Sequence, residues 1–215
     1  MATLLHIDSS LNGDNSVSRA VTRTFREAWE EQHPEGTVIY RDLAANPLPH
    51  IDALAYHTQY VPIAERTPEQ VAAFALREEL TSELESADAV LLGAPLYNYT
   101  IPSSLKAWLD HIIIMERTAG ENSTIAGKPV TVVTSRGGSY RPGTPMEGND
   151  YAVPYLEWLL TGALKMDASF IVPELTLAPI VPAMAPLLEK SRESAARAHE
   201  DARTTAKTLV SQLAA

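Results

Sequence analysis

Four loops in this 215-residue chain carry residue types that bind phosphate groups or flat aromatic rings, and each follows an apparent β-strand. Asp8 to Ser18 is rich in hydroxyl groups, Ala94 to Tyr99 holds two tyrosines and an asparagine, and Ser135 to Gly138 ends in two glycines. The fourth and weakest is the long stretch from Ser139 to Pro154. Open α/β sheets bind ligands at the carboxyl ends of their parallel strands, so such loops at one edge predict a flat, phosphorylated cofactor.

The hydroxyls of Ser10, Ser16 and Ser18 can converge on one centre, together with the free N–H groups of a helix capped by Ser16. Such a centre binds a phosphate dianion without lysine, because unpaired amides and the helix dipole both favour negative charge. The common glycine-rich phosphate motifs are absent, since this loop has only Gly13 and no Gly-Lys-Ser/Thr triplet. The alternative interpretation is an ordinary strand-to-helix turn, because serine favours turns.

The segment from Pro95 to Tyr99 can lay backbone amides and apolar surface along an isoalloxazine ring, with Asn98 hydrogen-bonded to its pyrimidine end. Gly137 and Gly138 let the backbone approach such a ring closely, because glycine has no side chain to clash. The alternatives are tyrosines that serve only in packing and a plain tight turn at the glycines. The two motifs are therefore informative in combination rather than singly.

The elements that must position these loops alternate along the chain. Apolar runs predict five strands, at Thr3–Asp8, Thr37–Tyr40, Ala89–Gly93, Val130–Thr134 and Ser169–Pro173. Helical periodicity and start signals predict helices at 16–33, 67–86, 103–115, 155–164 and 183–213. This alternation predicts an α/β fold, a flavodoxin-like doubly wound five-stranded parallel sheet in the order 2-1-3-4-5 with helices on both faces. One domain over 1–215 accounts for the chain, with long loops at about 43–67 and 139–154.

Composition excludes several classes of protein. With 45% hydrophobic and 20% charged residues the chain can bury a core, and its net charge of −10 argues against nucleic acid or an anionic membrane as partner. The chain has no cysteine, so disulfides, thiolate catalysis and cysteine-bound metal are excluded. The six histidines have no neighbours at metal-ligand spacing, so we expect no metal site. The N-terminus lacks a signal-peptide pattern, and we expect a cytoplasmic protein without membrane-spanning segments.

Six motifs spread over nearly the whole chain resemble one known family. They are Ser9-Ser10, Ser16-x-Ser18, Arg41 to Pro47, Ala94 to Tyr99, Leu105-Lys106 and Thr134 to Gly138. The chain resembles the FMN-dependent NADH-azoreductases, also described as NADH:quinone oxidoreductases, which implies a homodimer with one tightly bound FMN per subunit and active sites at the dimer interface. The implied cofactor-binding residues are Ser10, Ser16, Val17, Ser18, Pro95, Leu96, Tyr97, Asn98, Tyr99, Ser135, Arg136, Gly137, Gly138 and Tyr140.

The sequence departs from that family at positions that bear on the acceptor rather than on the cofactor. The segment between Met115 and Gly127 is shorter than in the bacterial azoreductases, which carry substrate-covering aromatic residues there. Tyr140 stands where histidine is common, and Thr161 and Gly162 stand where a bulky apolar side chain faces the partner's site. We therefore expect a more open substrate pocket at Tyr99, Tyr140 and Gly162.

The resemblance implies an enzyme that transfers hydride from NADH or NADPH through flavin N5 to quinones, with azo compounds as further acceptors. Donor and acceptor would use the same space in turn, which is a ping-pong order. The flavin carries the chemistry, so no side chain is expected to be catalytic. Tyr97, Asn98, Gly137 and Gly138 are expected to position the ring.

Other functions stay open from the sequence. One is a dedicated biosynthetic reductase of a particular polycyclic quinone, which is compatible with the departures from the family at the substrate pocket. Another is a flavodoxin-like electron carrier, against which the long loops argue, and a third is a flavin-free interaction protein. Donor choice is also open, with Arg117, Arg136 and Arg141 as conceivable partners of an NADPH 2′-phosphate. The apolar helix over 103–115 fits either dimerisation or burial under the 43–67 loop of the same chain.

Overall fold

The centre of the molecule is a five-stranded parallel sheet. The structure is a computed structural model that describes residues 2–213, so Met1, Ala214 and Ala215, the ends of the domain expected over 1–215, lie outside the described residues. The strands pair in the order β2-β1-β3-β4-β5, and all four pairings are parallel, which confirms the predicted topology. Their bounds are β1 Thr3–Asp8, β2 Thr37–Asp42, β3 Ala89–Gly93, β4 Pro129–Val133 and β5 Asp167–Ile171.

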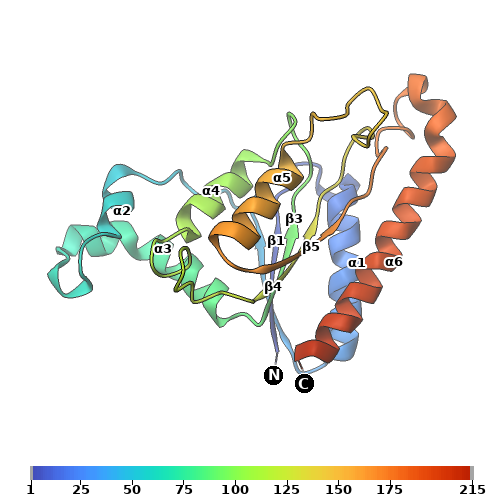
Figure 1. The fold of residues 1–215 in the computed structure, drawn as a ribbon. Helices are drawn as coiled ribbons and strands as arrows, with labels where there is room; N and C mark the ends of the chain where they lie inside the picture. The colour runs from blue at the N-terminus through green and yellow to red at the C-terminus, as the bar shows by residue number, and fades with distance from the viewer. Residues whose placement is uncertain (1, 214–215) are drawn as a thin grey trace.

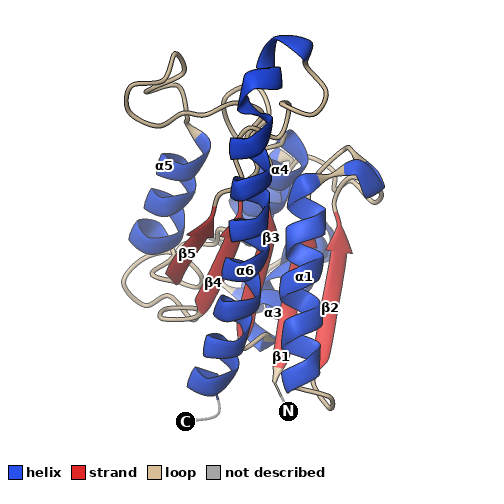
Figure 2. Ribbon diagram, turned by 90° about the vertical axis from the view of Figure 1, so that its right-hand side faces the viewer, coloured by secondary structure: helices blue, strands red, loops and turns tan. Residues whose placement is uncertain are grey.

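Helices cover both faces of this sheet (Figures 1 and 2). They are α1 Val17–Gln32, α2 Ala53–Thr58, α3 Pro68–Ser86, α4 Ser103–Ile112, α5 Ala152–Glu157 and α6 Leu188–Leu213, with 3-10 turns at Gly13–Asn15, Ile63–Glu65 and Pro182–Leu187 and a π-helical turn at Trp158–Ala163. α1 and α6 lie side by side on one face, while α3, α4 and α5 cover the other. Within the described residues, no helix combines the length and apolarity needed to cross a bilayer.

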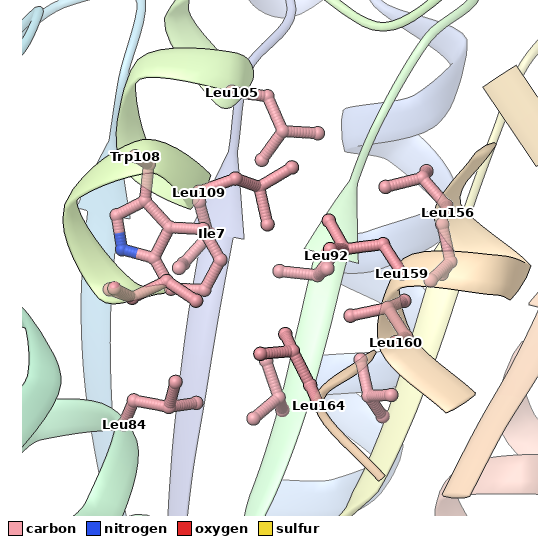
Figure 3. Packing of buried hydrophobic residues seen from close by; sticks show 14 of the residues in the cluster. Ile7, Leu84, Leu92, Leu105, Trp108, Leu109, Leu156, Leu159, Leu160 and Leu164 are labelled. Atoms are coloured by element: carbon pink, nitrogen blue, oxygen red, sulfur yellow. The ribbon is translucent and has the colours of Figure 1, made fainter. Parts of the chain in front are cut away.

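The sheet separates two apolar layers. Toward α3, α4 and α5, Ile7 of β1 and Leu92 of β3 pack against Trp108 of α4 and its neighbours (Figure 3). On the opposite face, Phe25 of α1 and Ala202 of α6 belong to a second buried cluster. β1 and β3 are therefore buried on both sides, as the inner strands of a doubly wound sheet are. This packing fixes the points from which the loops leave the sheet.

All of the strands end at one edge, drawn at the top of Figure 2. The loops after β1, β3, β4 and β5 leave the sheet there and lie close together. Because this sheet is parallel and open, that edge is the expected place for a ligand.

The stretch 43–67, predicted to be a loop, contains a helix. Asp52 caps α2 by accepting a hydrogen bond from Ala55 N at 2.8 Å. Arg77 of α3 then holds α2 in place by donating to the Ala55 carbonyl at 3.2 Å. A helix of six residues is too short to show an amphipathic period, which is why the sequence did not reveal it.

α4 ends at Ile112, three residues earlier than predicted. Ile113 is extended, and the Arg77 guanidinium donates to the carbonyls of His111 at 3.0 Å and Ile113 at 2.6 Å. A buried cation therefore satisfies carbonyls at the end of the helix. His111 Nε2 also lies 2.9 Å from the Pro49 carbonyl, so the chain itself covers this side of the apolar helix.

The remaining differences are shifts of element ends. β5 begins and ends two residues before the predicted strand. The fifth helix starts three residues early, at Ala152, and becomes π-helical at Trp158. The terminal helix is regular only from Leu188, because Pro186 in the preceding 3-10 turn has no N–H to continue an α-helical ladder.

Candidate functional site

The loop after β1 runs into α1 and leaves two backbone N–H groups free. Ser16 is the N-cap of α1, and its hydroxyl accepts a hydrogen bond from Arg19 N at 3.2 Å. The N–H groups of Val17 and Ser18 have no preceding carbonyl within a helix that starts here. Ser16 Oγ also lies 3.1 Å from Ser18 Oγ. Hydroxyls and amides thus gather at the positive end of the helix dipole, where anions bind.

The loop after β3 folds back toward the loop after β1. The Tyr97 hydroxyl lies 3.1 Å from Ser10 Oγ. Asn98 and Tyr99 have positive φ angles of 48° and 69°, and Tyr97 and Thr100 exchange backbone hydrogen bonds across them. Left-handed backbone is uncommon at tyrosine and persists where the surroundings enforce it, which marks this turn as a candidate site.

The loop after β4 is held from two sides. Leu96 N donates to the Ser135 carbonyl at 2.9 Å, and Leu177 N donates to the Gly137 carbonyl at 3.2 Å. A Cβ on Gly137 would lie 2.7 Å from Leu177 Cδ1, so a larger residue would displace the leucine. Gly138 has no such neighbour within 4 Å. The glycine loop is therefore fixed beside the loop after β3.

These three loops enclose a cavity of about 280 Å³ at the carboxyl edge of the sheet. Its lining comes from all three loops and from the segment after β5: Ser10, Asn12, Asn15, Ser16, Val17, Pro95, Leu96, Tyr97, Ser135, Gly137, Thr176, Leu177 and Ile180. A second cavity, of about 830 Å³, adjoins it at Tyr97, which lines both. A third, of about 750 Å³, lies between Gly138 and α6. The serine-rich loop, the Tyr97 turn and the glycine loop therefore meet in one place.

Comparison with known proteins assigns the chain to a family. A family model described as a flavodoxin-like fold matches residues 2–169. The chain belongs to this flavodoxin-like family. An FMN-dependent NADH:quinone oxidoreductase of Streptomyces avermitilis is 59% identical over 217 residues, covering 100% of both chains. A protein of the same name from Streptomyces coelicolor is 58% identical over 219 residues, covering 100% of this chain and 98% of the other.

Solved structures share the flavodoxin-like architecture. The azoreductase of Bacillus anthracis has a TM-score of 0.78 at 23% identity, covering 97% of this chain and 100% of that one. The NAD(P)H:quinone oxidoreductase of Methanothermobacter marburgensis has a TM-score of 0.66 at 19% identity, covering 95% and 96%. At such low identity these likenesses speak for the fold alone.

Most of the residues predicted to hold a cofactor surround the 280 Å³ cavity of this flavodoxin-like protein. Those that line it are Ser10, Ser16, Val17, Pro95, Leu96, Tyr97, Ser135 and Gly137. Ser18 is fully buried in contact with Ser16. Asn98 lines the 830 Å³ cavity, and Gly138 lines the 750 Å³ cavity. Ten of the fourteen predicted residues therefore line one of the three cavities.

Arg136, Tyr99 and Tyr140 line none of these three cavities. The Arg136 guanidinium pairs with Asp150 and with Glu174, the latter at 3.3 Å, and lies 5.7 Å from the centre of the Tyr140 ring. Burial raises the pKa of Tyr140, and the nearby Tyr99 adds to this shift. The two Nη atoms of Arg136 are therefore engaged by carboxylates, and the Arg136 backbone belongs to the glycine loop.

Gly162 lies on an exposed face of the π-helical turn. A Cβ there would come 3.7 Å from Cδ1 of Trp158, whose side chain is 67% exposed. Neither Gly162 nor Trp158 lines any of the three cavities. Within a single chain, Gly162 therefore does not share a cavity with Tyr99 or Tyr140. π-Helical turns are frequent at functional sites, so the surface around Trp158 and Gly162 is a candidate functional surface.

Sequence reasoning missed the segment after β5. Thr176, Leu177 and Ile180 all line the 280 Å³ cavity. Because β5 ends at the same edge as the other strands, topology alone could have pointed to the loop that follows it. Asn12 and Asn15 were also overlooked, although they lie within the serine-rich loop.

Proposed function

We propose that this protein is an FMN-dependent NADH:quinone oxidoreductase. The observation that carries the proposal is the 280 Å³ cavity, where the start of α1, the Tyr97 turn and the Gly137 loop meet. Two full-length relatives, at 59% and 58% identity, are FMN-dependent NADH:quinone oxidoreductases, which supports the same assignment.

The cavity fits the phosphate end of FMN. A phosphate dianion needs several donors, and the hydroxyls of Ser10 and Ser16 lie near the free N–H groups of Val17 and Ser18. No lysine or arginine is among the residues that line the cavity, so the amides and the helix dipole would balance the negative charge. The donor set is thus suited to a phosphate group held without a cation.

The Tyr97 turn and the glycine loop are suited to hold the isoalloxazine ring. When bound, FMN supplies a hydride acceptor and donor at N5, chemistry that protein side chains do not provide. Tyr97 and Asn98, with Gly137 and Gly138, would orient the ring by apolar contact and backbone hydrogen bonds. Because Tyr97 and Asn98 also line the 830 Å³ cavity, a ring held by this turn would border that space.

The 830 Å³ cavity is the candidate site for the donor and the acceptor. Its lining includes Leu11, Leu43, Ile101 and Tyr155, which suit flat, largely apolar molecules such as quinones, with azo compounds as further acceptors. Donor and acceptor would share this space and bind in turn, which is a ping-pong order. Its volume also supports the second candidate function, a dedicated reductase of a polycyclic quinone.

Ion pairing supports NADH rather than NADPH as the donor. All three arginines considered for a 2′-phosphate pair with carboxylates: Arg136 with Asp150 and Glu174, Arg141 with Glu174, and Arg117 with Glu78 and Glu85. Recruiting any of them would break an existing ion pair, and NADH requires no such partner.

We further propose a cytoplasmic homodimer in which the partner completes the substrate pocket. Tyr151 and Trp158 are 58% and 67% exposed, and large exposed aromatic side chains are typical of contact surfaces. Tyr151 N donates to the Tyr99 carbonyl at 2.9 Å, so this surface adjoins the Tyr97 turn. Gly162 beside Trp158 would face the partner's pocket. Light scattering of the purified protein should give the mass of two chains.

The test of function is the visible spectrum of the protein after FMN is added and the excess is removed. Retained yellow flavin that NADH bleaches without oxygen, and that a quinone restores, would support the proposal. Retained flavin that NADH does not bleach would favour a flavodoxin-like electron carrier. No retained flavin would overturn the assignment and leave the fold intact.

A further inference from the structure

Arg19 of α1 lies beside the serine-rich loop, yet every N–H group of its guanidinium already has a partner. Nε and Nη2 donate to the Ser10 carbonyl at 3.3 and 2.8 Å. Nη1 and Nη2 donate to the two carboxylate oxygens of Asp42 at 2.7 and 2.6 Å, and Nη1 also donates to Tyr40 Oη at 3.2 Å. A guanidinium has five N–H groups, so Arg19 has none left for a phosphate.

Asp42 links Arg19 to the residues that line the 830 Å³ cavity. One of its oxygens accepts hydrogen bonds from Ala44 N at 3.0 Å and Ala45 N at 3.1 Å, which sets the turn after β2. Leu43 and Ala44 line the 830 Å³ cavity. The hydrogen bonds from Arg19 hold the pKa of Asp42 below its ordinary value, so the pair is charged at neutral pH.

A buried carboxylate lies under the same loop. Asp8 is 3% exposed and accepts hydrogen bonds from Thr22 Oγ1 and Tyr40 Oη, each at 3.1 Å, while His6 Nε2 lies 3.3 Å from it. Tyr40 also accepts from Arg19, so the two carboxylate groups form one polar network. Connected polar groups in a protein interior hold each other in place, which gives the loop a rigid support.

Ser10 is the point at which this network reaches the 280 Å³ cavity. Among the described residues, its carbonyl accepts two hydrogen bonds, both from Arg19. Its hydroxyl, on the cavity side, lies 3.1 Å from Tyr97 Oη and accepts from Asn12 N at 3.3 Å. Arg19 therefore acts on the cavity through the backbone of Ser10 and not by touching a ligand.

We propose that Arg19 is a positioning residue for the phosphate of the cofactor. It holds Ser10 where the loop hydroxyls and the α1 amides converge, and through Asp42 it ties that centre to the neighbouring cavity. The inference rests on the proposed function and concerns the phosphate rather than the ring. Loss of Arg19 should therefore weaken FMN far more than riboflavin, which has the same ring and no phosphate.

The experiment compares Arg19→Gln with the matched variant Arg117→Gln. Arg117 also pairs with carboxylates, those of Glu78 and Glu85, and it lines none of the three cavities. Flavin fluorescence gives the dissociation constants of FMN and riboflavin, and circular dichroism with thermal unfolding of the apoprotein checks the fold. Arg19→Lys is a second variant, which keeps the charge but lacks the planar fork that joins two acceptors.

We expect Arg19→Gln to raise the dissociation constant of FMN at least about tenfold and that of riboflavin less than about twofold. Arg19→Lys should fall between Arg19→Gln and wild type, and Arg117→Gln should bind both flavins as wild type does. Arg19 variants that bind FMN normally, or that lose both flavins equally, would overturn the inference. A wild-type protein that binds neither flavin would overturn the proposed function, and the inference with it.

Discussion

The Tyr97 hydroxyl lies 3.1 Å from Ser10 Oγ, although 87 positions separate the two residues in the sequence. β1 and β3 are paired neighbours in the sheet, so the loops that follow them leave it side by side. The same hydroxyl accepts a hydrogen bond from Leu11 N at 3.1 Å. One side chain thus joins the loop proposed for the phosphate to the loop proposed for the ring.

Tyr97→Phe should weaken FMN binding about fivefold and lower the free energy of unfolding of the apoprotein by about 1 kcal/mol. The change removes the hydroxyl and leaves Leu11 N without this acceptor. Fluorescence titration and urea unfolding measure the two effects. Tyr60→Phe is the control, since Tyr60 is 60% exposed and its hydroxyl is 3.5 Å from that of Tyr56. Unchanged FMN affinity in Tyr97→Phe would show that the site does not need this link.

Gly93→Ala should lower the free energy of unfolding by about 3 kcal/mol. A Cβ there would lie 2.3 Å from Asp8 Oδ1 and 3.4 Å from Thr22 Cγ2. The buried Asp8 carboxylate cannot retreat without losing its hydrogen bonds, and a displaced buried charge adds to the cost of overpacking.

Urea unfolding of Gly93→Ala and Gly138→Ala gives the comparison. Gly138 has no atom within 4 Å of an added Cβ and no positive φ, so its variant should change stability by less than about 0.5 kcal/mol. Equal losses in the two variants would mean that contact with Asp8 is not the cause.

Features that depend on sequence neighbours were predictable. Ser16 was expected to cap a helix, and its hydroxyl accepts a hydrogen bond from Arg19 N three residues later. Short apolar runs marked the positions of the strands to within two residues. The signal is strongest in the inner strand β3, whose residues are all buried and apolar or glycine. The order of the strands then followed from their alternation with helices.

Pairing between distant polar side chains was not predictable. Arg136 was predicted to bind the cofactor because it adjoins two glycines, but its partners Asp150 and Glu174 lie 14 and 38 positions away. Arg19 was not predicted to have a role, since a lone arginine on an amphipathic helix is usually solvated. Its partner Asp42 lies 23 positions away. Such pairs leave no period in the sequence, so only the folded chain reveals them.

Arg77→Met should lower the free energy of unfolding by about 3 kcal/mol. The side chain is 1% exposed, and its guanidinium donates to the carbonyls of Ala55, His111 and Ile113. Methionine fills much of the volume of the arginine side chain. The loss of stability therefore comes mainly from the three unpaired carbonyls rather than from a cavity. Urea unfolding measures it, with the exposed Arg192→Met as control. A loss as small as that of the control would show that other donors replace the guanidinium.

Arg117 should make stability depend on pH in the acid range. Its hydrogen bonds hold the pKa values of Glu78 and Glu85 below their ordinary value. A carboxylate whose pKa is lowered in the folded state stabilises the fold above its unfolded pKa, about 4.3 for glutamate. That contribution disappears as the pH falls through the folded-state pKa, when both states become protonated.

Arg117→Gln should therefore be less stable than wild type at pH 7, and the difference should shrink as the pH falls from about 5 toward 3. Urea unfolding of both apoproteins over this range measures the difference, at low ionic strength because salt screens the exposed parts of the pairs. Arg192→Gln is the control, since Arg192 lies 3.6 Å from Glu189 and both side chains are exposed. A difference that stays constant with pH would contradict the ion-pair explanation, because the packing of the arginine stem does not titrate.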